Sequence, residues 1–298
     1  MNIKEAHEMF CQHQVYFKNY TKATITNHRD TLKIFLKILP EIEDLEQVTY
    51  LHAQRFFYTG RKDRNWKPTT FITHLVHMNV FYTWAVEKNM VEDNPFAHIE
   101  KPRLENALPK TLTKQEAFKI IEMAANMPAS SKFISMRNHA IFATFVYTGL
   151  RRKELCSLNC TDVDLENSVI HVRQGKGNKD RVVPIPYRLK VILERYIAER
   201  RKHRRTCPEF FASSAVDRGF TVHGLRHLHR ALVKAVGIRF SIHQLRHTFA
   251  TLMVEGGCDL YALSKMMGHS DIKTTTVYLS ASVEHLRGQI DKHPLNYI

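Results

Sequence analysis

The chain has 298 residues, 44% of them hydrophobic, which is enough for about two ordinary domains, each with its own core. Its 44 Lys and Arg residues exceed its 29 Asp and Glu residues by 15, a surplus that favours a polyanionic partner. The sequence has no long apolar segment, so nucleic acid is a better candidate for that partner than a membrane.

The five cysteines are odd in number and show no C-x-x-C spacing, so they indicate neither a disulfide framework nor a zinc ribbon. The first ten residues show no export signal. We therefore expect a reduced, cytoplasmic, nucleoid-associated protein.

The first hundred residues predict four helices, with apolar side chains at helical spacing. The second is expected to end at Pro40 and the third at Gly60, while Pro68 occupies the first-turn position of a long fourth helix. Basic residues cluster between the last two helices, where we expect one loop that contacts the DNA backbone: Arg61, Lys62, Arg64 and Lys67.

A proline-marked segment from 101 to 109 is typical of a linker. A capping-box pattern, Thr113 with Glu116, predicts the start of the next helix. We therefore place a domain boundary near 105, between a helical domain over 1–104 and a second domain over 105–298.

An apolar run from 137 to 147 stops at Thr148-Gly149. A glycine at the end of a buried helix allows a tight turn, which is expected to hold Arg151 at the edge of a cleft, with Glu154 bracing it. The alternative is a weak ion pair on a helix surface.

Alternating apolar residues at 169–173 and 181–185 predict two strands, and the glycines between them predict a hairpin. Lys176 would project from the tip into a DNA groove, and we assign Lys179 and Arg181 to DNA binding as well. No G-x-x-x-x-G-K-[ST] pattern is present, which excludes a P-loop.

Near the end of the chain, Ser241 and Gln244 form a second capping-box pattern. His243 then lies in the first helical turn and Arg246 on the same face, beside unpaired backbone N–H groups, a surface suited to a phosphate. A further helix is expected to stop at Gly268-His269, before a polar stretch that leads to Tyr278. A single histidine, arginine or tyrosine in such a position is more often a capping, surface or core group than a catalytic one.

Residues 220–227 repeat the pattern of 240–247 at a spacing of 20. Only the second copy has the capping box, because Gly224 stands where the second copy has Gln244. We therefore interpret the first copy as a supporting helix whose inward side chains are Leu225, Leu228 and Leu232.

The candidate side chains suit phosphoryl transfer. Two arginines can grip a phosphate bidentately and stabilise the charge that develops in the transition state. A tyrosine hydroxyl has a pKa of about 10 and needs a base, which His243 can provide, while a lysine at a hairpin tip can protonate the leaving oxygen.

Four motifs occur in order: T-G-L-R-x-x-E-L at 148–155, G-K-G-N-K-D-R at 175–181, H-x-L-R-H-T-F-A-T at 243–251 and G-H-x-x-x-x-T-T-x-x-Y at 268–278. Together they resemble the signature boxes of the tyrosine recombinases, the phage-integrase and Xer-type family. One departure is Met267, where the family usually has leucine, a near-isosteric change.

The resemblance implies a role for each matching residue. Arg151 and Arg246 would bind the phosphate, Lys176 would be the general acid, His243 and His269 would contact the phosphate, Tyr278 would be the nucleophile, and Glu154 would support them. It also implies a mainly helical fold with a small β-sheet, in which an N-terminal helical bundle and a catalytic domain close on DNA as a C-shaped clamp.

The implied activity is site-specific recombination through a 3′-phosphotyrosyl intermediate, by a tetramer on two DNA sites, without ATP, metal or cofactor. Accessory DNA-bending or regulatory proteins are possible partners, and we expect the tail from Val283 to Ile298 to pack on a neighbouring protomer. Two rival classes remain: a topoisomerase or nicking enzyme with the same residues, and a DNA-binding regulator without chemistry, although such a regulator would not retain all six reactive side chains. The pair His243 and His247 does not indicate a metalloenzyme, because it lacks the glutamate of H-E-x-x-H.

Overall fold

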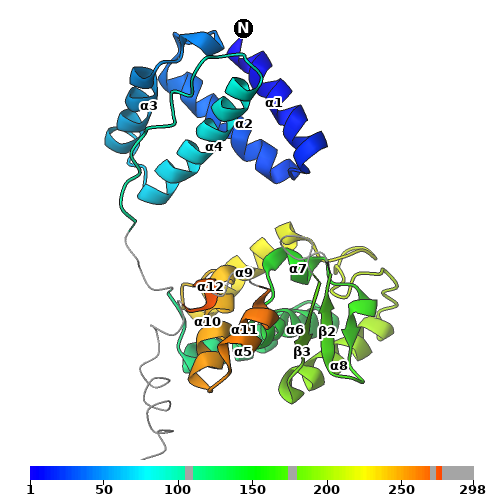
Figure 1. The fold of residues 1–298 in the computed structure, drawn as a ribbon. Helices are drawn as coiled ribbons and strands as arrows, with labels where there is room; N and C mark the ends of the chain where they lie inside the picture. The colour runs from blue at the N-terminus through cyan, green and yellow to red at the C-terminus, as the bar shows by residue number, and fades with distance from the viewer. Residues whose placement is uncertain (105–109, 174–179, 269–272, 277–298) are drawn as a thin grey trace, which may run out of the picture. The chain divides into compact units, whose positions relative to one another are not determined.

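The computed structural model describes residues 1–104, 110–173, 180–268 and 273–276. The chain divides into two compact units, Met1–Asn106 and Ala107–Ile298, called here the N-terminal and the C-terminal unit. Each has its own hydrophobic core, coloured blue to cyan and green to orange in Figure 1. The fold is mainly helical with one small sheet, as the sequence predicts.

The N-terminal unit is built from four α-helices and one short 3-10 helix, so the predicted helix number is correct for its described residues. Phenylalanine rings from different helices meet in its core; Phe10 and Phe81, for example, have ring centroids 5.4 Å apart. Pro68 occupies the first turn of its helix, as expected. The elements are α1 (Ile3–Lys18), α2 (Lys22–Ile38), η1 (Leu45–Gln47), α3 (Tyr50–Lys62) and α4 (Pro68–Glu87).

Helix α3 does not end at Gly60, and this corrects the predicted loop. A Cβ atom at Gly60 would lie 2.1 Å from the ring of Trp66, so the glycine makes room for that ring instead of ending the helix. The helix therefore continues to Lys62, and Arg61 and Lys62 lie in its last turn. Arg61 Nη1 donates to the carbonyl of Trp66 at 2.5 Å, which ties the turn to the helix.

The C-terminal unit surrounds α6, an almost completely buried helix that packs against α5, α8 and α10. The predicted capping box of Thr113 and Glu116 is present at the start of α5. The helices are α5 (Lys114–Asn126), α6 (Lys132–Thr148), α7 (Arg152–Cys156), η2 (Cys160–Asp162), α8 (Tyr187–Lys202), α9 (Val222–Val236), α10 (Ile242–Glu255), α11 (Leu260–Met267) and α12 (Lys273–Thr276).

The predicted hairpin is present as β2 (Val169–Val172) and β3 (Arg181–Pro184), which pair antiparallel with His171 opposite Val182. A third strand, β1 (Val163–Asp164), pairs with the other edge of β2. It is two residues long, too short to produce an alternating pattern, and the sequence analysis missed it. The hairpin tip lies outside the described residues.

The two sequence copies form α9 and α10. The capping box of Ser241 and Gln244 begins α10. At the start of α9 there is a single capping bond, in which the Thr221 side chain accepts from the N–H of Gly224. Leu225 and Leu232 are fully buried, and Leu228 packs partly buried against the same core, so the three inward side chains predicted for α9 are confirmed. Among the described residues, no helix has both the length and the hydropathy needed to cross a bilayer.

Candidate active site

Arg246 lies on the inner face of α10, and its side chain is anchored to backbone carbonyls. The residue is 3% exposed. Its Nη1 donates to the carbonyl of Gly149 at 2.7 Å, and its Nη2 donates to the carbonyl of Met267 at 2.5 Å. A guanidinium held from two sides keeps a fixed orientation, which is what charge stabilisation in a transition state requires.

The turn after α6 brings Arg151 beside Arg246. Gly149 ends α6 in the left-handed region, with φ of 61°, and a Cβ atom there would lie 2.4 Å from the ring of Phe249 in α10. The glycine therefore allows both the reversal of the chain and the close approach of α10. Arg151 follows as the N-cap of α7, with its side chain 26% exposed, at the edge of a cavity as the sequence predicts.

Glu154 joins two arginines through one buried carboxylate. Its Oε1 accepts from Arg151 Nη1 at 2.8 Å and from Arg181 Nη1 at 2.9 Å. Its Oε2 accepts from the backbone N–H of Arg151 and from Arg181 Nη2, both at 2.7 Å. Burial alone would raise the pKa of Glu154, but the hydrogen bonds and charge of Arg181, together with the hydrogen bonds from Arg151, outweigh burial and hold the pKa at about 2.

The position of Arg181 differs from the one assigned from the sequence. We expected this residue on the DNA-binding surface, but its side chain is 7% exposed and its Nε donates to the carbonyl of Met266 at 2.7 Å. The guanidinium therefore lies inside the fold, between the hairpin and α11. In this position it braces Glu154 and does not present a surface to a phosphate.

Three arginines from three elements converge on the carboxyl end of α11. The last carbonyls of a helix lack partners within it and carry the negative end of its dipole, so cations stabilise that end. Each of three consecutive carbonyls accepts from a different arginine: Met266 from Arg181 at 2.7 Å, Met267 from Arg246 at 2.5 Å and Gly268 from Arg151 at 3.1 Å.

Gly268→Ala is expected to destabilise the C-terminal unit. Gly268 has φ of 63°, and an added Cβ atom would lie 2.9 Å from Arg181 Cδ, so the substitution combines backbone strain of roughly 1–3 kcal/mol with displacement of that arginine. Gly257→Ala is the matched comparison, because Gly257 has φ of 80° and no atom within 4 Å of the added carbon. Thermal unfolding followed by far-UV circular dichroism should show the larger loss for Gly268→Ala; equal losses would contradict the contact.

Two histidines of α10 lie beside the arginines. Partial desolvation, followed by the charges of Arg246 and Arg151, lowers the pKa of His243 below its usual value. Burial, followed by His243 and Arg246, lowers the pKa of His247 to about 4. The two rings meet edge to face with centroids 4.4 Å apart. Both imidazoles are therefore neutral near pH 7, and a neutral imidazole can accept a proton.

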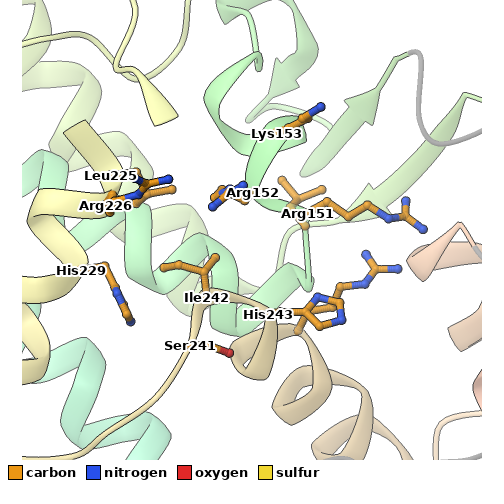
Figure 2. A pocket seen from close by; sticks show the side chains of 11 residues that line it. Arg151, Arg152, Lys153, Leu225, Arg226, His229, Ser241, Ile242 and His243 are labelled. Atoms are coloured by element: carbon orange, nitrogen blue, oxygen red, sulfur yellow. The ribbon is translucent and has the colours of Figure 1, made fainter. Parts of the chain in front are cut away.

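A cavity of about 550 Å³ opens over Arg151, His243 and Arg246. Figure 2 shows Arg151 and His243 at one end of it and Arg226 and His229 at the other. Arg152 also lines it, and both Arg152 and Arg226 are exposed. The sequence analysis gave neither residue a role, although the repeated Leu-Arg-His motif was a signal that α9 presents an arginine where α10 does.

Several predicted residues lie outside the described residues: Lys176, Lys179, His269, Tyr278 and the tail from 283 to 298. The structure brings together Arg151, Glu154, His243 and Arg246. Arg61, Lys62, Arg64 and Lys67 belong to the N-terminal unit and lie along the last turn of α3 and the connection to α4.

Residues 110–285 match the family described as the phage integrase family. The chain belongs to this family of tyrosine recombinases. Tyrosine recombinase XerC of Thermodesulfovibrio yellowstonii is 30% identical over 293 residues, which cover 94% of this chain and 95% of that protein. Tyrosine recombinase XerA of Pyrococcus horikoshii is 35% identical over 205 residues, 68% of each chain.

Solved structures of phage integrase family members share the fold. The XerH site-specific recombinase bound to a palindromic difH substrate, in a post-cleavage complex, aligns with a TM-score of 0.74 at 20% identity and covers 96% of this chain and 83% of its own. A lambda integrase dimer bound to a COC′ core site aligns with a TM-score of 0.72 at 18% identity, over 93% and 95%. At these identities the likeness establishes the fold.

Proposed function

We propose that this tyrosine recombinase cuts and rejoins DNA at specific sites through a covalent 3′-phosphotyrosyl intermediate formed by Tyr278. The observation that supports this most directly is the convergence of Arg151 and Arg246, from different elements, on one cavity that also contains His243. Two guanidinium groups fixed by backbone carbonyls form a preorganised site for a phosphodiester that gains negative charge in its transition state.

The proposed reaction keeps the free energy of the broken phosphodiester bond in the new bond between phosphorus and tyrosine. The phenol oxygen of Tyr278 forms a bond to the phosphorus, and the bond from phosphorus to the 5′ oxygen breaks. His243, neutral near pH 7, accepts the phenol proton, and Lys176 protonates the departing 5′ oxygen. A 5′-hydroxyl from a partner strand then reverses these steps, so the exchange proceeds without ATP or a metal ion.

Strand exchange between two sites needs more than one active site, and we place four protomers on two DNA duplexes, with accessory proteins as further possible partners. The tail from 283 to 298 is proposed to pack on a neighbouring protomer. Truncation after Ala281 should then abolish pairing of two DNA sites, measured as a slow-migrating complex in native gels. If the truncated protein still pairs two DNA sites, the tail does not join neighbouring protomers.

Replacing Tyr278 by phenylalanine should abolish the covalent adduct, because the substitution removes only the attacking oxygen. Wild-type protein is denatured directly in the cells that express it, and the protein-linked DNA is sequenced to define the target. A nicked duplex carrying that target is then incubated with wild type, Tyr278→Phe and Tyr261→Phe. Tyr261, on α11, is 61% exposed and serves as the comparison tyrosine. An adduct that persists in Tyr278→Phe would refute the proposed nucleophile.

A topoisomerase or nicking enzyme with the same residues is the second candidate, since the cavity alone does not require two DNA sites. Two plasmids that each carry the captured target separate the possibilities. A recombinase joins them into one circle, whereas a topoisomerase relaxes each plasmid and leaves them apart.

A further inference from the structure

Beyond the groups assigned to the reaction, we propose that Arg181 is a positioning residue. It makes no contact with DNA; instead it locks Glu154 and the carboxyl end of α11 together, and so fixes the orientation of Arg151. Two experiments test this role. The first measures DNA cleavage and so rests on the proposed function, whereas the second measures hydrogen exchange and does not.

The hydrogen bonds of Arg181 fix its guanidinium in one plane. Nη1 and Nη2 donate to the two oxygens of Glu154 at 2.9 and 2.7 Å, a parallel two-bond arrangement that arginine makes with carboxylates. The third contact, from Nε to the carbonyl of Met266 at 2.7 Å, points the other edge of the same group at α11. Lysine has one nitrogen in place of this fork and cannot reproduce the three contacts.

Arg181 acts on Arg151 through Glu154. Each oxygen of the carboxylate accepts one bond from Arg151 and one from Arg181. Glu154 is 9% exposed, and a buried carboxylate that loses one of two cationic partners is costly to keep in place. Without Arg181, the carboxylate therefore rearranges toward its remaining partner or toward water, and the orientation of the Arg151 side chain changes with it.

The position of Arg181 in the chain also connects this contact to the hairpin and to the end of α11. It is the first residue of β3, five positions after Lys176, so it attaches the hairpin that carries the proposed general acid to the wall of the cavity. Its Cδ also lies 2.9 Å from the position that a Cβ atom of residue 268 would take, and the next residue along the chain is His269. One side chain thus joins the segments that lead to three of the proposed reactive groups: Arg151, Lys176 and His269.

The first arm of the test separates positioning from DNA contact. Arg181→Met should reduce the rate of covalent adduct formation on the captured target about 100-fold, the effect expected when a reactive group is displaced by about 1 Å. Its affinity for that duplex, and the dependence of affinity on salt, should stay at the wild-type values. If Arg181 binds a phosphate instead, the salt slope falls by about 1 and affinity falls with it, which would overturn the proposal.

Arg173→Met is the matched variant. Arg173 follows β2 in the same hairpin and pairs with Asp162 at 2.7 Å, but its side chain is 64% exposed and it does not bond to Glu154 or to α11 among the described contacts. This variant should cleave at the wild-type rate, and equal rates for the two methionine variants would overturn the proposal. Should Arg181→Met fail to fold, as judged by circular dichroism, Arg181→Lys keeps the charge and should show a smaller cleavage loss with unchanged affinity.

The second arm needs no DNA cleavage. Amide hydrogen exchange of the free protein, read by mass spectrometry, should show faster exchange at residues 263–268 in Arg181→Met than in wild type or Arg173→Met. Unchanged protection there would refute the proposed link to α11. If wild-type protein forms no adduct on any DNA, the proposed function fails, and the exchange result still decides whether Arg181 holds the end of α11.

Discussion

Arg246→Ala is expected to lower the rate of covalent adduct formation by roughly 10²–10³-fold, because it removes one of the two guanidinium groups that stabilise charge on the phosphorus. The substitution also leaves the buried carbonyls of Gly149 and Met267 without their donors, which costs roughly 1–3 kcal/mol for each carbonyl left unpaired. Circular dichroism must therefore accompany the rate measurement, so that cleavage is compared at temperatures where both proteins are folded.

Two further variants make the comparison specific. Arg246→Lys keeps the positive charge but cannot hold two carbonyls and a phosphate at once, so cleavage should remain strongly impaired. Arg226→Ala changes the matching arginine of the first sequence copy, which is exposed at the other end of the same cavity. It should weaken DNA binding and reduce the salt slope by about 1 while bound complexes still cleave. The opposite pattern would mean that α9 carries the catalytic arginine.

Local signals in the sequence were sufficient for the elements on which the site is built. The start of α10 follows from Ser241 and Gln244, and the end of α6 follows from Gly149, because capping and left-handed turns depend on residues within one helical turn. The contact between Arg151 and Glu154 is local for the same reason, since the two residues are three positions apart. Such short-range geometry is determined by residue type and spacing.

Long-range contacts were not predictable in this way. Gly60 has the pattern of a helix end, but the ring of Trp66 packs against it, and α3 continues. Arg181 has the pattern of a DNA-binding residue beside a basic tip, but its partners are Glu154, 27 positions away, and Met266, 85 positions away. A charged side chain is assigned to the surface by default, and only the packing of β3 against α7 and α11 shows that this one is buried.

The buried histidines of the N-terminal unit were also missed, because histidine at helical spacing resembles an ordinary polar position. His7 and His28 are each 3% exposed. Burial, with smaller contributions from nearby positive groups, lowers the pKa of His7 to about 3 and that of His28 to about 4. In α4, burial also lowers the pKa of His77 and, together with His77 and Arg64, that of His74 to about 4.

Mild acid is therefore expected to unfold the N-terminal unit. Histidines in an unfolded chain titrate near 6.5, so above that pH both states are uncharged and stability does not depend on these rings. Between about pH 6.5 and the lowered folded pKa values, the unfolded state binds protons that the folded state does not, and stability falls by about 1.4 kcal/mol per pH unit for each protected ring. His7 and His28 alone remove roughly 5 kcal/mol by about pH 4.5, on the order of the whole stability of a small domain.

Tryptophan fluorescence can follow this transition in the full chain, because its two tryptophans, Trp66 and Trp84, both lie in the core of the N-terminal unit. The urea midpoint from this signal should drop steeply between about pH 6.5 and about pH 4.5. His28→Phe removes one titrating ring from among Phe10, Tyr20 and His77 and should flatten the pH dependence, whereas His98→Gln, at an exposed position, should not. A midpoint that stays constant across this range would show that the folded unit accepts the protons, for instance by opening around α2 without global unfolding.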